Sequence, residues 1–392
     1  MVNLVFFLIS LLLMPMLTGP PTVSGLPKLH NAIQLTSPNP QRLGTFGGAV
    51  ATDGKLVVVG AWGESAGRPY SGRAYIFGAR TGNLLFTLVS PNPDLGGNFG
   101  FSVAVDRGLV VVGAPFETIA GFEPFAGRAY VFSSTTGDLL YTLSNPNPVP
   151  LDPYRLPVLG AAFGSAVAIS GGLIVISGLG EGRVYVYSAS TGVLMLSLAN
   201  PGRSVALDGG LLVVGSGFED VAGNPAAGRA YVFNVTTGRL LLTLSSPNPQ
   251  IEGLFGWSVW VGKGLVVVGA RQETIAGQFQ AGNAYVFGAT TGSLLFTLTS
   301  PDPHFIGSFG ASVSGGDGVV LVGAPSENGG RAYVFNIQTG RLMFALSSTH
   351  PPNGGGFGWS LSASDSVVVV GAGFENAGAS SEDDSVGHTY IF

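Results

Sequence analysis

The chain has 392 residues, with 17 basic and 22 acidic side chains and a formal net charge of −5. So little positive charge gives phosphate groups few partners, which argues against nucleic acid as a ligand. The low charge together with a hydrophobic content of 46% excludes an intrinsically disordered chain. Cysteine is absent, so no disulfide framework is available and the fold depends on its apolar core.

Residues 1–25 differ from the rest of the chain. The apolar stretch from Leu4 to Met14 has the length of a signal-peptide core, and Val23-Ser24-Gly25 supplies small residues for cleavage before Leu26. We interpret residues 1–25 as an export signal and residues 26–392 as one domain. A retained membrane anchor is the alternative, because no Lys or Arg precedes the apolar stretch. Beyond it no apolar run approaches the roughly 20 residues of a membrane-spanning helix. We therefore expect no membrane span after cleavage, and a secreted or cell-surface location.

The remainder of the chain is built from seven copies of one repeat. Each copy opens on a short signature such as FGFSV, and the copies start near residues 46, 99, 163, 202, 255, 309 and 357. In the second copy the signature is followed by LVVVGA at Leu109–Ala114, GRAYVF at Gly127–Phe132 and LLYTL at Leu139–Leu143. Four short runs in roughly 52 residues match the length of a β-propeller blade.

The side chains of these runs suit a blade that is covered on both faces. The second run is an unbroken series of valines, and the third alternates small with aromatic residues, as in Ala129, Tyr130, Val131 and Phe132. The first run is rich in Gly, Ser and Ala, which fits the crowded axis of a propeller. The sequence therefore predicts an all-β fold, a seven-bladed β-propeller with four-stranded antiparallel blades.

The two ends of the chain complete each other. The last copy stops at residues 388–392, its third run, whereas Ala32–Pro40 (AIQLTSPNP) resembles the end of a fourth run, as in Thr87–Pro93 (TLVSPNP). We predict that a strand at residues 32–37 completes the seventh blade by pairing near Tyr390. Such pairing closes the ring and removes an exposed sheet edge.

These residues resemble the FG-GAP repeat family of β-propellers. The family's Phe-Gly and Gly-Ala-Pro pairs occur here as Phe99-Gly100 with Gly113-Ala114-Pro115, and as Phe309-Gly310 with Gly323-Ala324-Pro325. The resemblance is closest to microbial members, which are related to the integrin α-chain propeller, and it implies extracellular adhesion or ligand binding. The TG-x-LL start of the fourth run is also similar to quinoprotein propeller repeats.

Integrin-type propellers bind calcium in an Asp-rich loop between the first two strands. The equivalent turns here carry at most one Asp each, as in Asp53-Gly54 and Asp106-Arg107-Gly108. Calcium takes about six or more oxygen ligands. We therefore expect no calcium loops and no metal site.

The loops after the second and fourth strands are long and varied, and they emerge on one face, which we call the long-loop face. A Glu follows the second strand in each unit: Glu64, Glu117, Glu181, Glu219, Glu273, Glu327 and Glu375. Five units start the third strand with Arg: Arg73, Arg128, Arg183, Arg229 and Arg331. Asn283 and His388 take this place in the other two. We interpret these Glu and Arg residues as structural pairs within each blade. A charged ring on the long-loop face is the alternative.

Breaks in the repeat indicate where a ligand would bind. The loop at residues 149–160 is the longest between blades and has Tyr154 and Arg155 at its middle, and unit four is entered directly through Gly202-Arg203. Unit three has almost no loop after its second strand. We predict a binding site at Tyr154, Arg155 and Arg203; a spacer without a partner is the alternative. We interpret Trp257, Trp260 and Trp359 as core packing.

The sequence contains no HExxH, GxSxG or phosphate-loop motif. We therefore expect no enzyme and no cofactor. Our leading hypothesis is an extracellular or cell-surface binding and adhesion module that engages a glycan or protein through the long-loop face. A structural subunit that self-assembles into a coat, sheath or filament is a second hypothesis. A propeller hydrolase or quinone-dependent oxidoreductase is a third.

Overall fold

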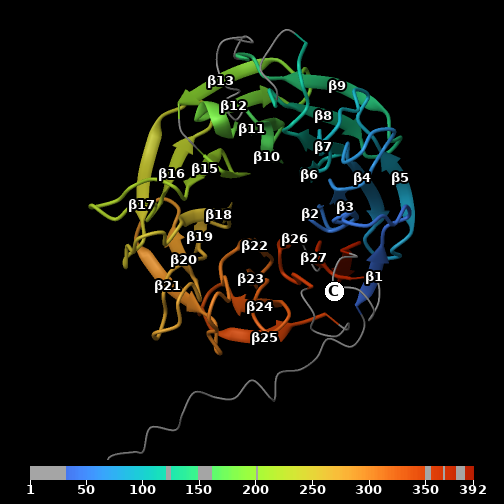
Figure 1. Ribbon diagram of the computed structural model, residues 1–392. Helices are drawn as coiled ribbons and strands as arrows, with labels where there is room; N and C mark the ends of the chain where they lie inside the picture. The colour runs from blue at the N-terminus through green and yellow to red at the C-terminus, as the bar shows by residue number, and fades with distance from the viewer. Residues whose placement is uncertain are drawn as a thin grey trace, which may run out of the picture.

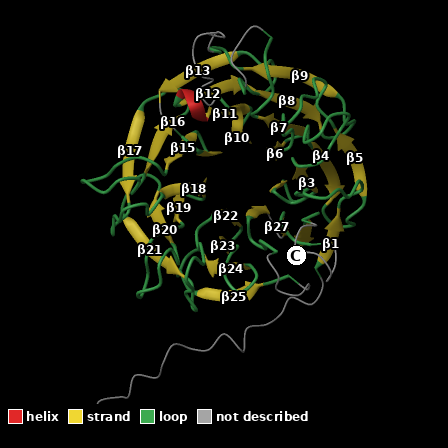
Figure 2. Cartoon of the chain, in the orientation of Figure 1, coloured by secondary structure: helices red, strands yellow, loops and turns green. Residues whose placement is uncertain are grey.

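The computed structural model describes residues 32–120, 125–148, 161–199, 202–348, 355–364, 367–376 and 385–392. These residues form 28 β-strands and one short 3-10 turn, η1 (Leu179–Glu181) (Figure 2). The strands make seven four-stranded antiparallel sheets, which are arranged radially around one axis (Figure 1). The predicted seven-bladed β-propeller is confirmed. No helix in the described ranges is long and apolar enough to span a membrane.

Each blade contributes one strand to each of four concentric positions. The innermost strands are β2 (Ala49–Thr52), β6 (Ser102–Asp106), β10 (Phe163–Ser170), β14 (Ser204–Asp208), β18 (Phe255–Gly262), β22 (Ser312–Gly316) and β26 (Ser360–Ser364). The second strands are β3 (Leu56–Ala61), β7 (Leu109–Ala114), β11 (Leu173–Gly178), β15 (Leu211–Ser216), β19 (Leu265–Ala270), β23 (Val319–Ala324) and β27 (Val367–Ala372). The third strands are β4 (Arg73–Gly78), β8 (Arg128–Ser133), β12 (Arg183–Ser188), β16 (Arg229–Asn234), β20 (Asn283–Gly288), β24 (Arg331–Asn336) and β28 (His388–Ile391). The outermost strands are β5 (Leu84–Leu88), β9 (Leu139–Ser144), β13 (Leu194–Ala199), β17 (Leu240–Ser245), β21 (Leu294–Thr299), β25 (Leu342–Leu346) and β1 (Ile33–Thr36).

The Phe-Gly signature forms the joint between neighbouring blades. Phe99 is fully buried and packs against Tyr130 and Phe132 of its own blade, with ring centroids 5.6 and 5.9 Å apart. The same cluster includes Ile76 of the preceding blade. Gly100 follows with φ +90°, and its carbonyl oxygen approaches so closely that a Cβ on Gly60 would lie 2.0 Å from it. Phe therefore fills the space between two sheets, and the glycines let their backbones approach.

The ring closes as predicted. Strand β1 pairs antiparallel with β28 in the register Ile33↔Ile391, Gln34↔Tyr390, Leu35↔Thr389 and Thr36↔His388. It is the outermost strand of the blade β1-β28-β27-β26. Leu35 is buried in a cluster that joins this blade to the first one. The closing strand therefore contributes both backbone hydrogen bonds and apolar packing.

This closure can be tested with neighbouring substitutions in β1. Leu35→Ala removes a buried side chain from the junction and should lower the free energy of unfolding by about 2–5 kcal/mol. Gln34→Ala, at an exposed position of the same strand, should change it by less than about 0.5 kcal/mol. Guanidinium denaturation of the two variants makes the comparison. Equal effects would contradict a closing role for the buried face of β1.

Candidate functional site

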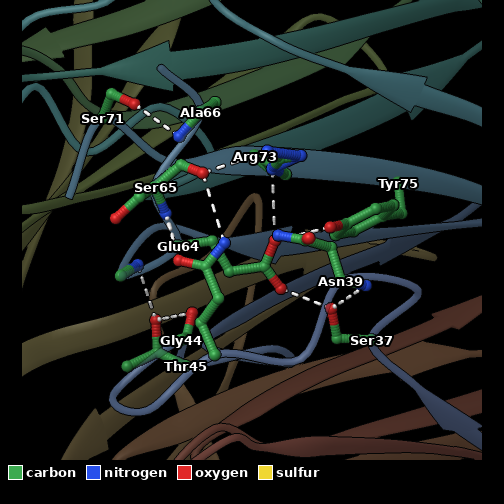
Figure 3. Close-up of polar contacts among 12 residues, drawn as sticks. Ser37, Asn39, Gly44, Thr45, Glu64, Ser65, Ala66, Ser71, Arg73 and Tyr75 are labelled. Carbon is green, nitrogen blue, oxygen red and sulfur yellow. Dashed lines mark hydrogen bonds and ion pairs between the residues drawn. The ribbon is translucent and has the colours of Figure 1, made fainter. Parts of the chain in front are cut away.

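Five of the seven repeated glutamates are buried, and six of the seven join neighbouring blades. Glu64 accepts hydrogen bonds from Tyr75 of its own blade, at 2.5 Å, and from Ser37 in the loop that leaves β1 (Figure 3). The tyrosine partner recurs in every blade: Tyr75, Tyr130, Tyr185, Tyr231, Tyr285, Tyr333 and Tyr390. A residue from the preceding blade donates to six of the glutamates: Ser37, Ser90, Asn145, Ser246, Ser300 and Ser348. We call this arrangement the Ser-Glu-Tyr link.

The expected arginine partners contribute less regularly. Ion pairs join Arg73 to Glu64 at 3.5 Å, Arg128 to Glu117 at 3.3 Å and Arg229 to Glu219 at 2.5 Å. Arg183 instead donates to Ser197 at 3.0 Å, and among the described residues no ion pair joins it to Glu181. Nor does one join Arg331 to Glu327 within the same ranges. Asn283 donates to Glu273 at 2.9 Å, and His388 lies 3.2 Å from Glu375.

This geometry suits a structural role better than a charged surface ring. The side chains of Glu64, Glu117, Glu273 and Glu327 have no solvent exposure. Sequence reasoning singled out the glutamates but missed tyrosine as their constant partner. The signal was present in the tyrosine that every copy of the third run carries, and in the Ser that stands 27 residues before the Glu in five units.

Burial dominates the electrostatics of these links. It raises the pKa of five carboxyl groups above the usual value, against hydrogen bonds that act in the opposite direction: Glu64, Glu117, Glu181, Glu273 and Glu327. Burial also acts to raise the pKa of Glu375, but the contacts with His388, Ser348 and Tyr390 outweigh it and hold that pKa below the usual value. The pKa of Glu375 is therefore shifted in the opposite direction to the pKa values of the glutamates in the two neighbouring blades.

These pKa shifts predict a pH dependence of stability. A carboxyl group with a raised folded-state pKa binds its proton more tightly in the folded state, so its contribution is full below the unfolded pKa and is lost as pH rises through the folded pKa. As pH rises from 5 to 7, the five carboxyl groups with raised pKa values should therefore lower the free energy of unfolding. Glu273→Gln should make this decline shallower, whereas Glu375→Gln should leave it nearly unchanged, because a group with a lowered pKa changes the stability only below its usual pKa. Guanidinium denaturation at both pH values measures the slopes; identical slopes in the two variants would refute the assignment.

One end of the propeller axis has a cavity with a different chemistry. Its volume is about 210 Å³, and we call it the axial mouth; it is lined by Gly48, Trp62, Phe101, Arg203, Trp257, Arg271, Ala311 and Trp359. These residues occupy two positions of the repeat, the one after the Phe-Gly signature and the one after the Gly-Ala pair. Both positions adjoin the long loops, at the start of the first strand or the end of the second. The axial mouth therefore opens on the long-loop face.

Two arginines share one aromatic ring in the axial mouth. The guanidinium carbons of Arg203 and Arg271 each lie over the indole of Trp257, 3.9 Å from its centroid. Within the part of the chain that the structure describes, neither side chain has an ion pair with a carboxylate, and Nε of Arg271 is buried without a hydrogen-bond partner. Burial lowers the pKa of Arg203, and burial together with the charge of Arg203 lowers the pKa of Arg271 to about 10. An anion bound here would stabilise both positive charges.

Aromatic rings surround the two arginines. Trp62 packs against Phe101 with ring centroids 6.0 Å apart, and Trp257 against Phe218 at 6.0 Å. Trp359 meets Phe374 edge to face at 4.8 Å and is 38% exposed. Trp257 and Trp359 do not only pack in the core, as we interpreted them from the sequence, because both line the axial mouth. Trp260, three residues after Trp257 in β18, does pack against the next blade.

The structure places the predicted binding residues in two groups. Arg203 lies in the axial mouth, whereas Tyr154 and Arg155 lie outside the described residues. Sequence reasoning missed Trp62 and Arg271, which stand where other copies of the repeat have the Pro of Gly-Ala-Pro. Comparing the seven copies position by position would have found them, because a bulky or charged residue replaces a proline there.

The opposite end of the axis is acidic. A cavity of about 360 Å³ there is lined in part by Asp53, Asp106, Asp208, Asp317 and Lys263. Asp53 caps its turn by accepting the N–H groups of Lys55 and Leu56 at 2.9 and 2.8 Å. Across the described ranges no cluster of three His, Cys, Asp or Glu side chains could hold a metal ion. Asp53 therefore has a local role in its hairpin turn.

Two family models match the chain. Residues 34–77 match the FG-GAP repeat, and residues 70–383 match the model described as outer membrane protein assembly factor BamB. The chain is an FG-GAP β-propeller and belongs to the BamB family. No curated protein matches it. The second match covers most of the length of this FG-GAP propeller and includes the whole axial mouth apart from Gly48 and Trp62.

Proposed function

We propose that the chain is an extracellular or cell-surface binding module that engages a glycan or protein through its long-loop face. The observation that carries the proposal is the axial mouth, where Arg203 and Arg271 stack on Trp257 without a carboxylate partner in the described ranges. Unpaired, partly buried positive charge reduces the stability of a folded protein. Its presence is understandable if a ligand supplies the missing partner.

The loops around the axial mouth support this proposal. They carry exposed aromatic side chains, including Tyr70 at 45%, Phe218 at 59% and Phe305 at 64% exposure. Phe305 packs against another exposed ring, Phe279, with centroids 5.9 Å apart. Aromatic and arginine side chains are enriched at interfaces because they give large contact areas and directional hydrogen bonds. The proposed extracellular location rests on the apolar stretch within residues 1–25.

An enzymatic function has less support from this geometry. A hydrolase of the glycosidase type needs two carboxyl groups that reach the substrate. None of the residues that line the axial mouth is acidic. Four of the repeated glutamates have no solvent exposure and are held in Ser-Glu-Tyr links.

The binding function can be tested with paired substitutions. The chain lacking residues 1–25 should bind a subset of a glycan and surface-protein array. Trp359→Ala combined with Phe218→Ala should weaken that binding at least tenfold, because both side chains are exposed beside the axial mouth. Met195→Ala, exposed at the outer rim, is the matched control and should bind normally. Undiminished binding by the double variant would show that the long-loop face is not the binding surface.

A second candidate function is a structural subunit that self-assembles, and one feature favours it. Eleven apolar side chains at the start of the outermost strands are each at least 40% exposed, and we call them the rim belt: Leu84, Leu85, Leu139, Leu140, Leu194, Met195, Leu240, Leu241, Leu294, Leu295 and Met343. In six blades a register shift makes the second residue of the outermost strand a β-bulge. Isolated exposed leucines are common, but a repeated apolar belt is a feature of contact surfaces.

Assembly through the rim belt would have a direct signature. Negative-stain microscopy of the purified chain would show ordered arrays or filaments without an added partner. Leu140→Lys combined with Leu295→Lys would disperse them, because two charges would then lie in the belt. Thr142→Lys adds a charge at an exposed position of the same strand outside the belt, and this variant would still assemble. A monodisperse monomer at all concentrations in size-exclusion chromatography would exclude this function.

A further inference from the structure

We propose that the axial mouth binds one acidic sugar residue, a pyranose ring that carries a carboxylate. This inference rests on the proposed binding function and names the class of ligand. It depends on three features of the axial mouth, namely its unpaired arginines, its aromatic surfaces and its small volume.

The arginines define the charge of the ligand. Both guanidinium carbons lie 3.9 Å from one indole centroid, so the two positive charges are within about 8 Å of each other, which is no more than a Debye length at physiological ionic strength. Dissolved ions therefore screen their repulsion only in part. A guanidinium group forms parallel hydrogen bonds to a carboxylate, and the buried Nε of Arg271 has no partner within the described chain. A carboxylate fits this environment better than a neutral hydroxyl group.

The aromatic residues define the rest of the ligand. Trp62, Phe101 and Trp359 line the same cavity as the two arginines. Tryptophan and phenylalanine present flat apolar surfaces, on which the C–H face of a sugar ring can lie. An acidic peptide would satisfy the arginines through a flexible chain but would leave these surfaces uncovered.

The volume of the axial mouth limits the distance between the two parts of the ligand. A cavity of about 210 Å³ has the volume of roughly seven water molecules. A carboxylate and a stacking group that both lie inside it must therefore be close together. A hexuronic acid meets this condition because its carboxylate is attached directly to the ring.

The axial mouth also defines the stoichiometry. Its lining residues differ from blade to blade, since Gly48, Phe101, Arg203, Trp257, Ala311 and Trp359 occupy one repeat position. The arginine pair therefore occurs once per ring. We expect one acidic sugar per chain, in contrast to a repeated site that would bind up to seven.

The experiment is a calorimetric titration of the chain lacking residues 1–25 with digalacturonate and diglucuronate, each against its methyl ester and the matching neutral disaccharide. We expect one site per chain, at least tenfold weaker binding of the ester and the neutral sugar, and weaker binding as NaCl rises from 50 to 500 mM. Sodium acetate and sodium sulfate serve as free-anion probes and should compete only weakly, because they cannot stack.

Two arginine variants complete the test. Arg271→Met should reduce digalacturonate binding at least tenfold while leaving the thermal midpoint of the free protein unchanged or higher, because it removes a charge whose pKa the fold lowers. Arg239→Gln, an exposed arginine at the opposite end of the propeller, should bind normally. Equal binding of acid and ester, preference for an acidic peptide, or an Arg271→Met variant that binds normally would each overturn the acidic-sugar inference. Binding of another ligand through Trp359 and Phe218 would still support the proposed binding function. If the chain bound neither the acidic sugars nor any member of the glycan and surface-protein array, both the acidic-sugar inference and the proposed binding function would be wrong.

Discussion

The buried carboxylate of the Ser-Glu-Tyr link is the interaction on which the ring depends. Valine strands give each blade two apolar faces, but apolar faces alone do not set the distance or rotation between neighbouring blades. A glutamate that must satisfy its charge away from water has few solutions. It accepts hydrogen bonds from a tyrosine of its own blade and a serine of the preceding one, as Glu64 does with Tyr75 and Ser37. The link thereby fixes one blade against the next.

The exception in the fourth blade shows what happens when the link changes. Unit four is entered through Asn200-Pro201-Gly202-Arg203, without the longer exit loop that precedes the other blades. Glu219 is 25% exposed there, and its ion pair with Arg229 at 2.5 Å is shorter than the two other arginine pairs. The same irregular entry carries Arg203 in place of the aromatic or small residue that follows Phe-Gly elsewhere. A local departure from the repeat therefore accompanies the placement of one positive charge at the axis.

The sequence predicted the fold well because the repeat is visible in every blade. Phe99, Gly100 and the valines of β7 pack within their own blade and against the adjacent one. Their pattern can therefore be interpreted without coordinates. The closing strand was also predictable, since AIQLTSPNP matches an exit loop elsewhere in the chain. The partner of the glutamates was harder to identify. In five blades the third strand starts with Arg and has Tyr two residues later, so the sequence offers two candidate partners. Only the structure shows that the tyrosine hydroxyl reaches the carboxylate in all seven blades.

The axial mouth could not be predicted in the same way, because its residues are far apart along the chain. Trp62 and Trp359 lie at opposite ends of the sequence, and Arg271 occupies a position that is proline in two other blades. Each of these residues looks like a minor deviation within its own repeat. These residues come together only when the ring closes. Predicting the site from the sequence therefore requires a comparison of the same repeat position across all seven blades.

The two ends of the axis have opposite charge for different physical reasons. At one end the tight turns between the first and second strands favour Asp, because its side chain caps the turn, as Asp53 does for Lys55 and Leu56. Asp106, Asp208 and Asp317 occupy the equivalent turns of three other blades and line the same cavity. At the other end no turn requires Arg203 or Arg271, and their burial beside each other opposes the charged state of both. Turn chemistry therefore gives a reason for aspartate at the acidic end, whereas no turn accounts for the two arginines, and this difference is the physical reason for proposing that the long-loop face binds a ligand.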